Sequence, residues 1–337
     1  MNYIITGGTG FIGTHLTKLL NELHPEAKVY NLDIVKPGTP LPTVKDYKSP
    51  LKEGESVKAE FIYCDVRKPI ELNIPISSED IIFNFAAVHR TPGHPDYEYF
   101  ETNIRGAENV CAFAEKHGIK KIVFTSSIAP YGAAEELKEE TTLPTPNTPY
   151  GISKLIAEKI HTIWQAKNET ERQLTIVRPG VVFGKGENGN FTRLYWAIKG
   201  HKFAYPGRKN TIKACIYVKE LVRFMIYRLE NHEEGVELYN CCFEPAYTIQ
   251  HIVEAMKKVT GLTSTVFDIP NWIIMPAATA IGALGAPMGI CPARVKKLQI
   301  STNICGKKLK NSGYQFKWTF EDALKDWFED NDKRWLK

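Results

Sequence analysis

The sequence predicts an α/β fold with a doubly wound parallel sheet and a smaller C-terminal region. Strand-like patterns alternate with helical patterns near residues 99–117 and 149–168, which is the order of parallel strands joined by crossover helices. The strand patterns are continuous apolar runs, as expected where both faces of a sheet are covered. These runs lie at residues 3–5, 29–32, 60–63, 81–85, 121–124 and 174–177.

A glycine-rich turn directly follows the first predicted strand. Residues 6–13 read Thr-Gly-Gly-Thr-Gly-Phe-Ile-Gly and lead into an amphipathic helical pattern. Such glycines permit a tight turn, let backbone N–H groups approach a pyrophosphate, and bring the helix close to the strand. The sheet is therefore expected to be of the Rossmann type, with a dinucleotide next to Gly7, Gly10, Phe11, Ile12 and Gly13.

An acidic residue indicates which dinucleotide is bound. Asp33 directly follows the second predicted strand, 20 residues after Gly13. A carboxylate there accepts hydrogen bonds from the ribose hydroxyls of NAD and repels the 2′-phosphate of NADP. No arginine stands beside Asp33, and Lys36 is expected to be a solvated loop charge. The sequence therefore favours NAD.

A tyrosine and a lysine form the second chemical motif. Tyr150 and Lys154 are four residues apart at the start of a helical pattern and share one face. A nearby ammonium is expected to lower the pKa of the tyrosine and make it a usable base. Thr125, Ser126 and Ser127 end a strand at the ligand-binding edge, where one hydroxyl is expected to bond a substrate oxygen.

Taken together, these motifs resemble those of the extended short-chain dehydrogenase/reductase family over nearly the whole chain. The matching segments are the turn at 6–13, Asp33, Cys-Asp-Val at 64–66, Asn-Phe-Ala-Ala at 84–87, Asn103, the run at 123–132, Tyr-Gly-Ile-Ser-Lys at 150–154 and Arg-Pro-Gly-Val-Val-Phe-Gly at 178–184.

The resemblance implies roles for individual residues. It implies a catalytic triad of Ser127, Tyr150 and Lys154, the last two of which also contact NAD. The resemblance further implies that Asp65 and Val66 contact the cofactor at its adenine. It implies that Ala86 and Ala87 line the cofactor's diphosphate.

The resemblance also narrows the reaction. Sugar-nucleotide dehydratases of the family carry an Asp-Glu pair where this chain has Ile128 and Ala129. The segments 86–90, 189–191 and 293–298 are most similar to bacterial 4-epimerases of UDP-hexosamines and of undecaprenyl-diphosphate-linked N-acetylglucosamine. The expectation is a 4-epimerase of a diphosphate-linked hexose or N-acetylhexosamine. A 4-keto-sugar reductase and a non-catalytic NAD-binding regulatory protein are the alternatives, and the carrier stays open.

Substrate contacts are expected from residues outside the cofactor motifs. Besides Ser127, the candidates are Asn190, Arg294 and His89, with Arg90 beside His89. Many relatives have an arginine where this chain has Lys213. Because lysine cannot bind a phosphate in the bidentate manner of arginine, Arg294 is the better candidate for the diphosphate.

Composition limits the class of partner. The 337 residues are 43% hydrophobic and 24% charged, with a formal net charge of +5 and no arginine-rich block, so nucleic acid is not expected. Seven cysteines form no Cys-x-x-Cys pair, and no signal peptide is evident, so a reduced cytoplasmic protein is expected, without a metal site. The family resemblance suggests a homodimer through helices 99–117 and 149–168.

The domain division is expected near residue 180. Residues 1–180 form the NAD-binding domain, to which the chain returns near 213–243 with a strand around 214–218, and 181–337 mainly bind substrate.

Residues 269–293 carry no charge, and Arg294, Lys296 and Lys297 follow. Prolines and glycines argue against a spanning helix. A buried lid over the substrate, slightly favoured, and an interfacial element on anionic lipid are the two interpretations.

Overall fold

The computed structural model describes residues 1–337 apart from 38–50, 52–55, 90–92, 234, 284–291 and 337. At its centre is a seven-stranded sheet in the order β12-β7-β5-β4-β1-β2-β3, with every neighbouring pair parallel. The strands are β1 (Asn2–Thr6), β2 (Lys28–Asp33), β3 (Glu60–Tyr63), β4 (Ile81–Asn84), β5 (Lys121–Thr125), β7 (Gln173–Pro179) and β12 (Val236–Cys241). The predicted doubly wound sheet is confirmed.

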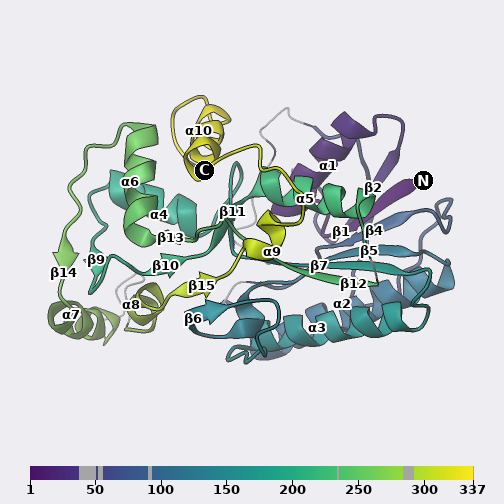
Figure 1. The fold of residues 1–337 in the computed structure, drawn as a ribbon, viewed down its shortest axis with the longest axis horizontal. Helices are drawn as coiled ribbons and strands as arrows, with labels where there is room; N and C mark the ends of the chain where they lie inside the picture. The colour runs from purple at the N-terminus through teal and green to yellow at the C-terminus, as the bar shows by residue number, and fades with distance from the viewer. Residues whose placement is uncertain (38–50, 52–55, 90–92, 234, 284–291, 337) are drawn as a thin grey trace.

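Helices cover both faces of this sheet (Figure 1). Helices α1 (Phe11–Leu23) and α5 (Val218–Glu230) pack together on one face, and α2 (Asp96–Lys116) and α3 (Pro149–Ala166) pack together on the other. All four residues of β4 are buried between these layers. This two-sided burial explains why the strands read as continuous apolar runs.

The strand order places a switch point between β1 and β4. The chain runs outward from β1 through β2 to β3, then returns to β4 and continues outward through β5, β7 and β12. Ligands of open α/β sheets bind at the carboxyl ends of the strands beside such a point. The glycine-rich turn follows β1, and the segment 125–127 lies at the end of β5, two strand spacings away. This separation is about 10 Å.

The C-terminal half builds a second region beside the sheet, with its own aromatic-rich core. One of its smaller sheets has the order β13 (Tyr247–Thr248), β10 (Ile212–Lys213), β15 (Thr302–Ile304) and β6 (Ala134–Lys138), the last contributed by the N-terminal half of the chain. Another pairs β9 (Tyr205–Pro206) with β14 (Asp268–Ile269). Its helices are α4 (Asn190–Lys199), α6 (Ile249–Thr260), α7 (Asn271–Ala283), α8 (Pro292–Gln299), α9 (Lys307–Lys310) and α10 (Phe320–Glu329).

The strand expected around 214–218 does not enter the main sheet. It is β11 (Cys215–Tyr217), which pairs with β8 (Val181–Phe183). Helix α5 then crosses the sheet against α1, and β12 is the strand that pairs with β7. Helix α5 is therefore the crossover that leads to the strand beside β7, and β11 pairs with β8 before that crossover begins. The domain boundary near 180 stays a prediction.

The described part of the charge-free segment is largely exposed, which does not match the burial expected of a lid over the substrate, and residues 284–291 of the segment lie outside the described residues. Its first part forms α7 at the periphery of the molecule (Figure 1), and among residues 271–280 only Ala278 is buried. The Trp272 residue is 76% exposed. Helix α7 contains Pro276 and has 13 residues. Within the described residues, no helix has the length and apolar character needed to cross a membrane.

Candidate active site

The glycine-rich turn forms a cradle with no room for side chains. Gly7 has φ +70°, and a Cβ there would lie 2.8 Å from the backbone nitrogen of Ala86. A Cβ on Gly13 would lie 2.6 Å from the carbonyl oxygen of Gly8. Helix α1 begins after Gly10 with no side-chain cap and no acidic residue in its first turn. Its free N–H groups and positive end therefore suit the diphosphate of a dinucleotide.

Asp33 is held in place at the end of β2. Its carboxylate accepts hydrogen bonds from the backbone nitrogens of Thr9, at 3.3 Å, and Val35, at 3.2 Å. Burial raises the pKa of Asp33, and these hydrogen bonds oppose the rise. The turn thus orients the carboxylate expected to bind ribose hydroxyls.

Asp65 has a partner that the sequence analysis missed. The Arg67 Nε and Nη2 atoms donate to the two oxygens of Asp65 at 2.8 Å and 2.7 Å. The Arg67 guanidinium therefore holds the pKa of Asp65 below its usual range. Val66, between them, is buried. The carboxylate implied to contact adenine is fixed before any ligand arrives, and the two-residue spacing is the signal that identifies this pair in the sequence.

The segment after β4 is clamped by an asparagine of α2. Asn103 Oδ1 accepts from the Val88 backbone nitrogen at 2.9 Å, and its Nδ2 donates to the Val88 carbonyl at 3.0 Å. These bonds fix the segment that follows β4, and Ala86 of this segment lies against Gly7. The roles implied for Ala86 and Ala87 at the diphosphate stay predictions.

Helix α3 presents the tyrosine and lysine together. The Thr148 hydroxyl caps its first turn by accepting from the Gly151 nitrogen, and Pro149 opens the helix. Tyr150 therefore falls in the first turn and Lys154 lies one turn later on the same face. The Lys154 side chain is buried, and its Nζ donates to the Thr125 carbonyl at 2.8 Å.

The pKa of Tyr150 is raised rather than lowered in the structure, contrary to the expectation from the sequence. Burial raises it to about 12, although a hydrogen bond with Ser127 opposes the rise. Burial also lowers the pKa of Lys154 to about 7, and Glu158 opposes that change. Removing Tyr150 from water disfavours its charged form more than the Ser127 hydrogen bond favours it, and removing Lys154 from water outweighs the negative charge of Glu158 in the same way.

The three hydroxyl groups at the end of β5 have different surroundings. Ser126 donates to Glu158, and the Thr125 hydroxyl is buried with no hydrogen-bond partner in the described part of the chain. Ser127 bonds Tyr150 and accepts from the Ala129 nitrogen at 3.1 Å. Ser127 is therefore the hydroxyl that the fold brings to Tyr150.

The substrate candidates are not brought into one group by the described contacts. Asn190 begins α4, is exposed, and its Oδ1 accepts from Arg193 at 3.0 Å. His89 is exposed, while Arg90 lies outside the described residues. The backbone of Arg294 lies in α8, but its side chain is outside what the structure describes. These roles stay predictions.

Lys213 lies in the C-terminal region. Lys213 donates to the Ile300 carbonyl at 2.6 Å, so its ammonium holds β10 against the end of α8.

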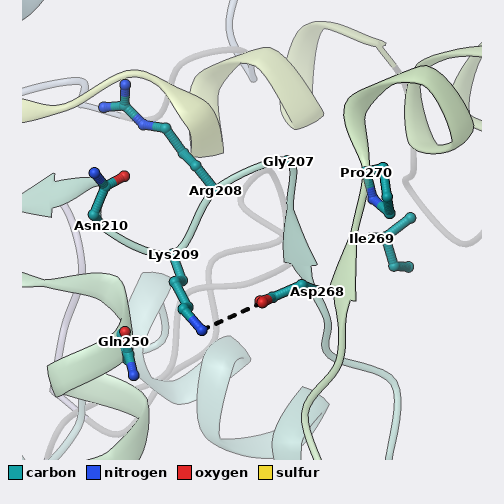
Figure 2. A pocket seen from close by; sticks show the side chains of 8 residues that line it. All are labelled: Gly207, Arg208, Lys209, Asn210, Gln250, Asp268, Ile269 and Pro270. Atoms are coloured by element: carbon teal, nitrogen blue, oxygen red, sulfur yellow. Dashed lines mark hydrogen bonds and ion pairs between the residues drawn. The ribbon is translucent and has the colours of Figure 1, made fainter.

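A cavity of about 520 Å³ opens between the loop after β9 and β14 (Figure 2). Its lining comprises Gly207, Arg208, Lys209, Asn210, Gln250, Asp268, Ile269 and Pro270. None of these was predicted as a site residue, and the cavity adjoins the base of α7.

Comparison with known proteins identifies the family. The sequence profile described as "NAD dependent epimerase/dehydratase family" matches residues 3–242, from β1 to beyond the end of β12. The chain belongs to this family. NAD is accordingly its cofactor. The glycine cradle, Asp33, Asp65, Tyr150 and Lys154 stay the predicted contacts to it.

Several curated relatives are named as sugar 4-epimerases. The chain is 30% identical over 328 residues to the N-acetyl-α-D-glucosaminyl-diphospho-ditrans,octacis-undecaprenol 4-epimerase of Escherichia coli O157:H7, covering 96% of this chain and 93% of that protein. It is 27% identical to the UDP-glucose 4-epimerase of Bacillus subtilis, covering 77% of this chain and 83% of that one. The UDP-glucose 4-epimerase structure from Thermotoga maritima shares its fold, with a TM-score of 0.71, 21% identity and 99% of each chain covered.

Gly13→Ala tests the cradle. The added Cβ meets backbone atoms that cannot rotate away, so the turn must open, and we expect NAD to bind about tenfold more weakly or worse. Isothermal titration with NAD measures the change. Gly200→Ala is the control, because Gly200 has φ −85° and its closest contact would be 3.2 Å. Wild-type affinity in Gly13→Ala would contradict the cradle.

Proposed function

We propose that the chain is an NAD-dependent 4-epimerase of a diphosphate-linked N-acetylhexosamine or hexose, acting through a transient 4-keto sugar. The observation that carries this proposal is the placement of Ser127, Tyr150 and Lys154 at the carboxyl edge of the sheet beside the glycine cradle. One acid–base group beside a hydride carrier is all that 4-epimerisation requires.

The residues divide the work as follows. Tyr150 accepts the proton of the sugar 4-hydroxyl and later returns it, Ser127 donates a hydrogen bond to the same oxygen, and the Lys154 ammonium stabilises the phenolate. Bound NAD would supply the hydride chemistry at C4 of the sugar, and the positive charge of its oxidised ring would favour ionised Tyr150. Proton and hydride are both returned, so the reaction consumes no reductant.

We propose a polyprenyl diphosphate as the carrier and N-acetylglucosamine as the sugar. The relative named for undecaprenol matches 96% of this chain, whereas the UDP-glucose 4-epimerase of Bacillus subtilis matches 77%. The exposed apolar helix α7 also suits an enzyme whose substrate is anchored in a lipid leaflet. UDP-N-acetylglucosamine is the competing substrate.

An epimerase assay tests the activity. Purified protein is incubated separately with undecaprenyl-diphosphate- and UDP-linked N-acetylglucosamine, and the sugar released by mild acid is identified. We expect N-acetylgalactosamine from the lipid-linked substrate without added reductant, and a loss of about 10²- to 10⁴-fold in Tyr150→Phe. Turnover that consumes NAD(P)H stoichiometrically with a 4-keto sugar would instead establish a reductase.

We further propose that α7 rests on the inner face of a membrane. Trp272 and Ile273 are exposed on a helix without charged residues, and exposed Lys296 follows on α8. Tryptophan and apolar side chains insert at the interface, and a nearby basic residue adds about 1 kcal/mol on an anionic surface.

Vesicle flotation tests this placement. Wild-type protein is expected to float with anionic vesicles at low salt and less at high salt, because salt screens the basic attraction. A Trp272→Ser/Ile273→Ser variant should lose flotation. Leu143→Ser is the matched control, because Leu143 is 79% exposed elsewhere on the chain. Absence of flotation by wild-type protein at either salt concentration would refute the membrane proposal.

We also propose a homodimer through α2 and α3. Ile152, Ile156 and Ile163 are exposed along one face of α3, a pattern that favours burial against a second copy.

Sedimentation velocity measures the oligomeric state. We expect a dimer, converted to monomer by Ile156→Asp/Ile163→Asp, because charges in an apolar interface lose hydration without gaining partners. Leu23→Asp, at an exposed site on α1, serves as the control and should leave the dimer intact. A monomeric wild-type protein would exclude this interface.

A further inference from the structure

A buried ion pair lies directly behind the catalytic lysine. Glu158 stands one turn after Lys154 on α3, and Arg178 reaches it from β7. The Arg178 Nε and Nη2 atoms donate to the two carboxylate oxygens of Glu158 at 2.8 Å and 2.6 Å. The two side chains are only 3% and 5% exposed. Such a pair is costly to bury and needs a reason other than stability, because apolar residues would pack as well.

A third donor connects this pair to the reacting groups. The Ser126 hydroxyl donates to Glu158 Oε1. Ser126 stands between Thr125, whose carbonyl accepts from Lys154 Nζ, and Ser127, which bonds Tyr150. One carboxylate therefore holds the strand end that carries both partners of the Tyr150–Lys154 motif.

The same carboxylate supplies negative charge to a buried ammonium. The groups around Lys154 are Tyr150, Glu158 and His161 from its own helix, Phe124 and the Thr125 carbonyl from β5, Arg178 behind Glu158 from β7, and Tyr99 from α2 beside Tyr150. Burial lowers the pKa of Lys154 to about 7, and Glu158 is the group that opposes this effect. Burial lowers the pKa of His161 to about 4, so His161 is neutral at pH 7.

We propose that Glu158, held by Arg178 and Ser126, is a positioning residue that keeps Lys154 charged and fixes the end of β5 against it. Replacing Glu158 with glutamine removes a negative charge beside Lys154 and leaves Arg178 unbalanced. Both effects favour the neutral amine.

Direct titration of Lys154 tests this role without relying on turnover. The protein is labelled with lysine carrying ¹³C at Cε, the Lys154 signal is assigned by its loss in Lys154→Arg, and its midpoint is followed by NMR against pH. We expect Glu158→Gln to lower the midpoint by about one pH unit or more, and Glu158→Asp, which retains the charge, to restore most of it.

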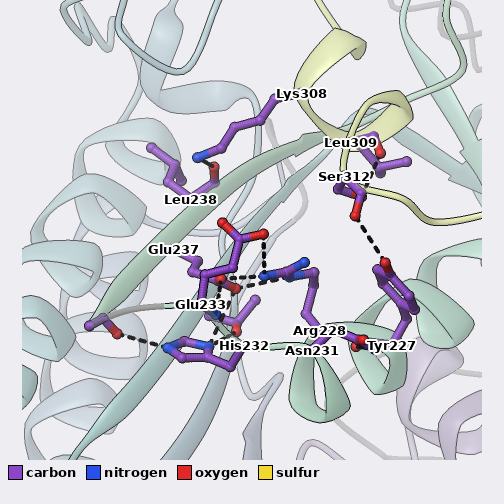
Figure 3. Close-up of polar contacts among 12 residues, drawn as sticks. Tyr227, Arg228, Asn231, His232, Glu233, Glu237, Leu238, Lys308, Leu309 and Ser312 are labelled. Carbon is purple, nitrogen blue, oxygen red and sulfur yellow. Dashed lines mark hydrogen bonds and ion pairs between the residues drawn. The ribbon is translucent and has the colours of Figure 1, made fainter.

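The chain provides a matched control on the opposite face of the sheet. Arg228 of α5 and Glu237 of β12 form another buried bidentate pair, with His232 against the same carboxylate (Figure 3). Glu237→Gln makes the same change in a similar pair, away from Lys154. It is expected to lower the melting temperature while leaving the Lys154 midpoint unchanged.

Kinetics provide a second readout, which rests on the proposed epimerase. The pH at which kcat/KM falls on the alkaline side should move with the titration midpoint of Lys154. At a pH above this fall, Glu158→Gln should have a kcat/KM about tenfold below that of wild-type protein. Glu237→Gln should keep the wild-type pH profile. Absence of epimerase activity in wild-type protein would refute the proposed function, while the NMR titration would still decide the role of Glu158.

A double variant covers the case in which Glu158→Gln does not fold. Glu158→Gln/Arg178→Met removes both charges and is expected to leave a Lys154 midpoint below that of wild-type protein, because Glu158 is the nearer charge. The proposal would be overturned if Lys154 kept its wild-type titration midpoint in Glu158→Gln or in Glu158→Gln/Arg178→Met. It would also be overturned if Glu237→Gln shifted the Lys154 midpoint as much as Glu158→Gln does.

Discussion

Burial of the Lys154 ammonium is the constraint on which the rest of the site depends. A buried charge needs hydrogen-bond acceptors and a compensating charge, or it is lost by deprotonation. Here the Thr125 carbonyl accepts a hydrogen bond from the ammonium, and Glu158 lies one turn away, itself paired with Arg178. The end of β5, the first two turns of α3 and the end of β7 must therefore keep their relative positions, and Ser127 and Tyr150 are positioned by the same contacts.

The cofactor half of the site obeys a different constraint, which is close approach of backbone to backbone. A Cβ at Gly7 would meet the Ala86 nitrogen, and one at Gly13 would meet the Gly8 carbonyl. The turn after β1 therefore packs against the segment after β4, and Asn103 holds that segment from α2. Because β1 and β4 flank the switch point of the sheet, this packing also defines where the dinucleotide meets the reacting groups.

A polar network inside the sheet links these two halves. The Thr6 hydroxyl donates to Asn84 Oδ1, and Asn84 Nδ2 donates to His161 Nε2. His161 donates in turn through Nδ1 to the Ala157 carbonyl, which sets its tautomer, and its ring stacks on Phe124. The strand that carries the glycine turn and the helix that carries Lys154 are thereby joined through β4. Each member is buried and satisfied, so the network specifies one arrangement rather than several.

The sequence by itself determined those features of the fold and the site that follow from the spacing of residues close together in the chain. The apolar runs, the glycine turn, Asp33 at the end of β2, and Tyr150 and Lys154 one turn apart all express spacing, which the chain order contains. Glu158, four residues after Lys154, had the same kind of signal and was missed because its partner Arg178 is distant in the sequence. Only the tertiary structure decided that burial raises the pKa of Tyr150, that β12 rather than β11 joins β7, and that α7 is exposed. Burial and strand neighbours depend on what packs from elsewhere in the chain, and spacing alone does not contain that information.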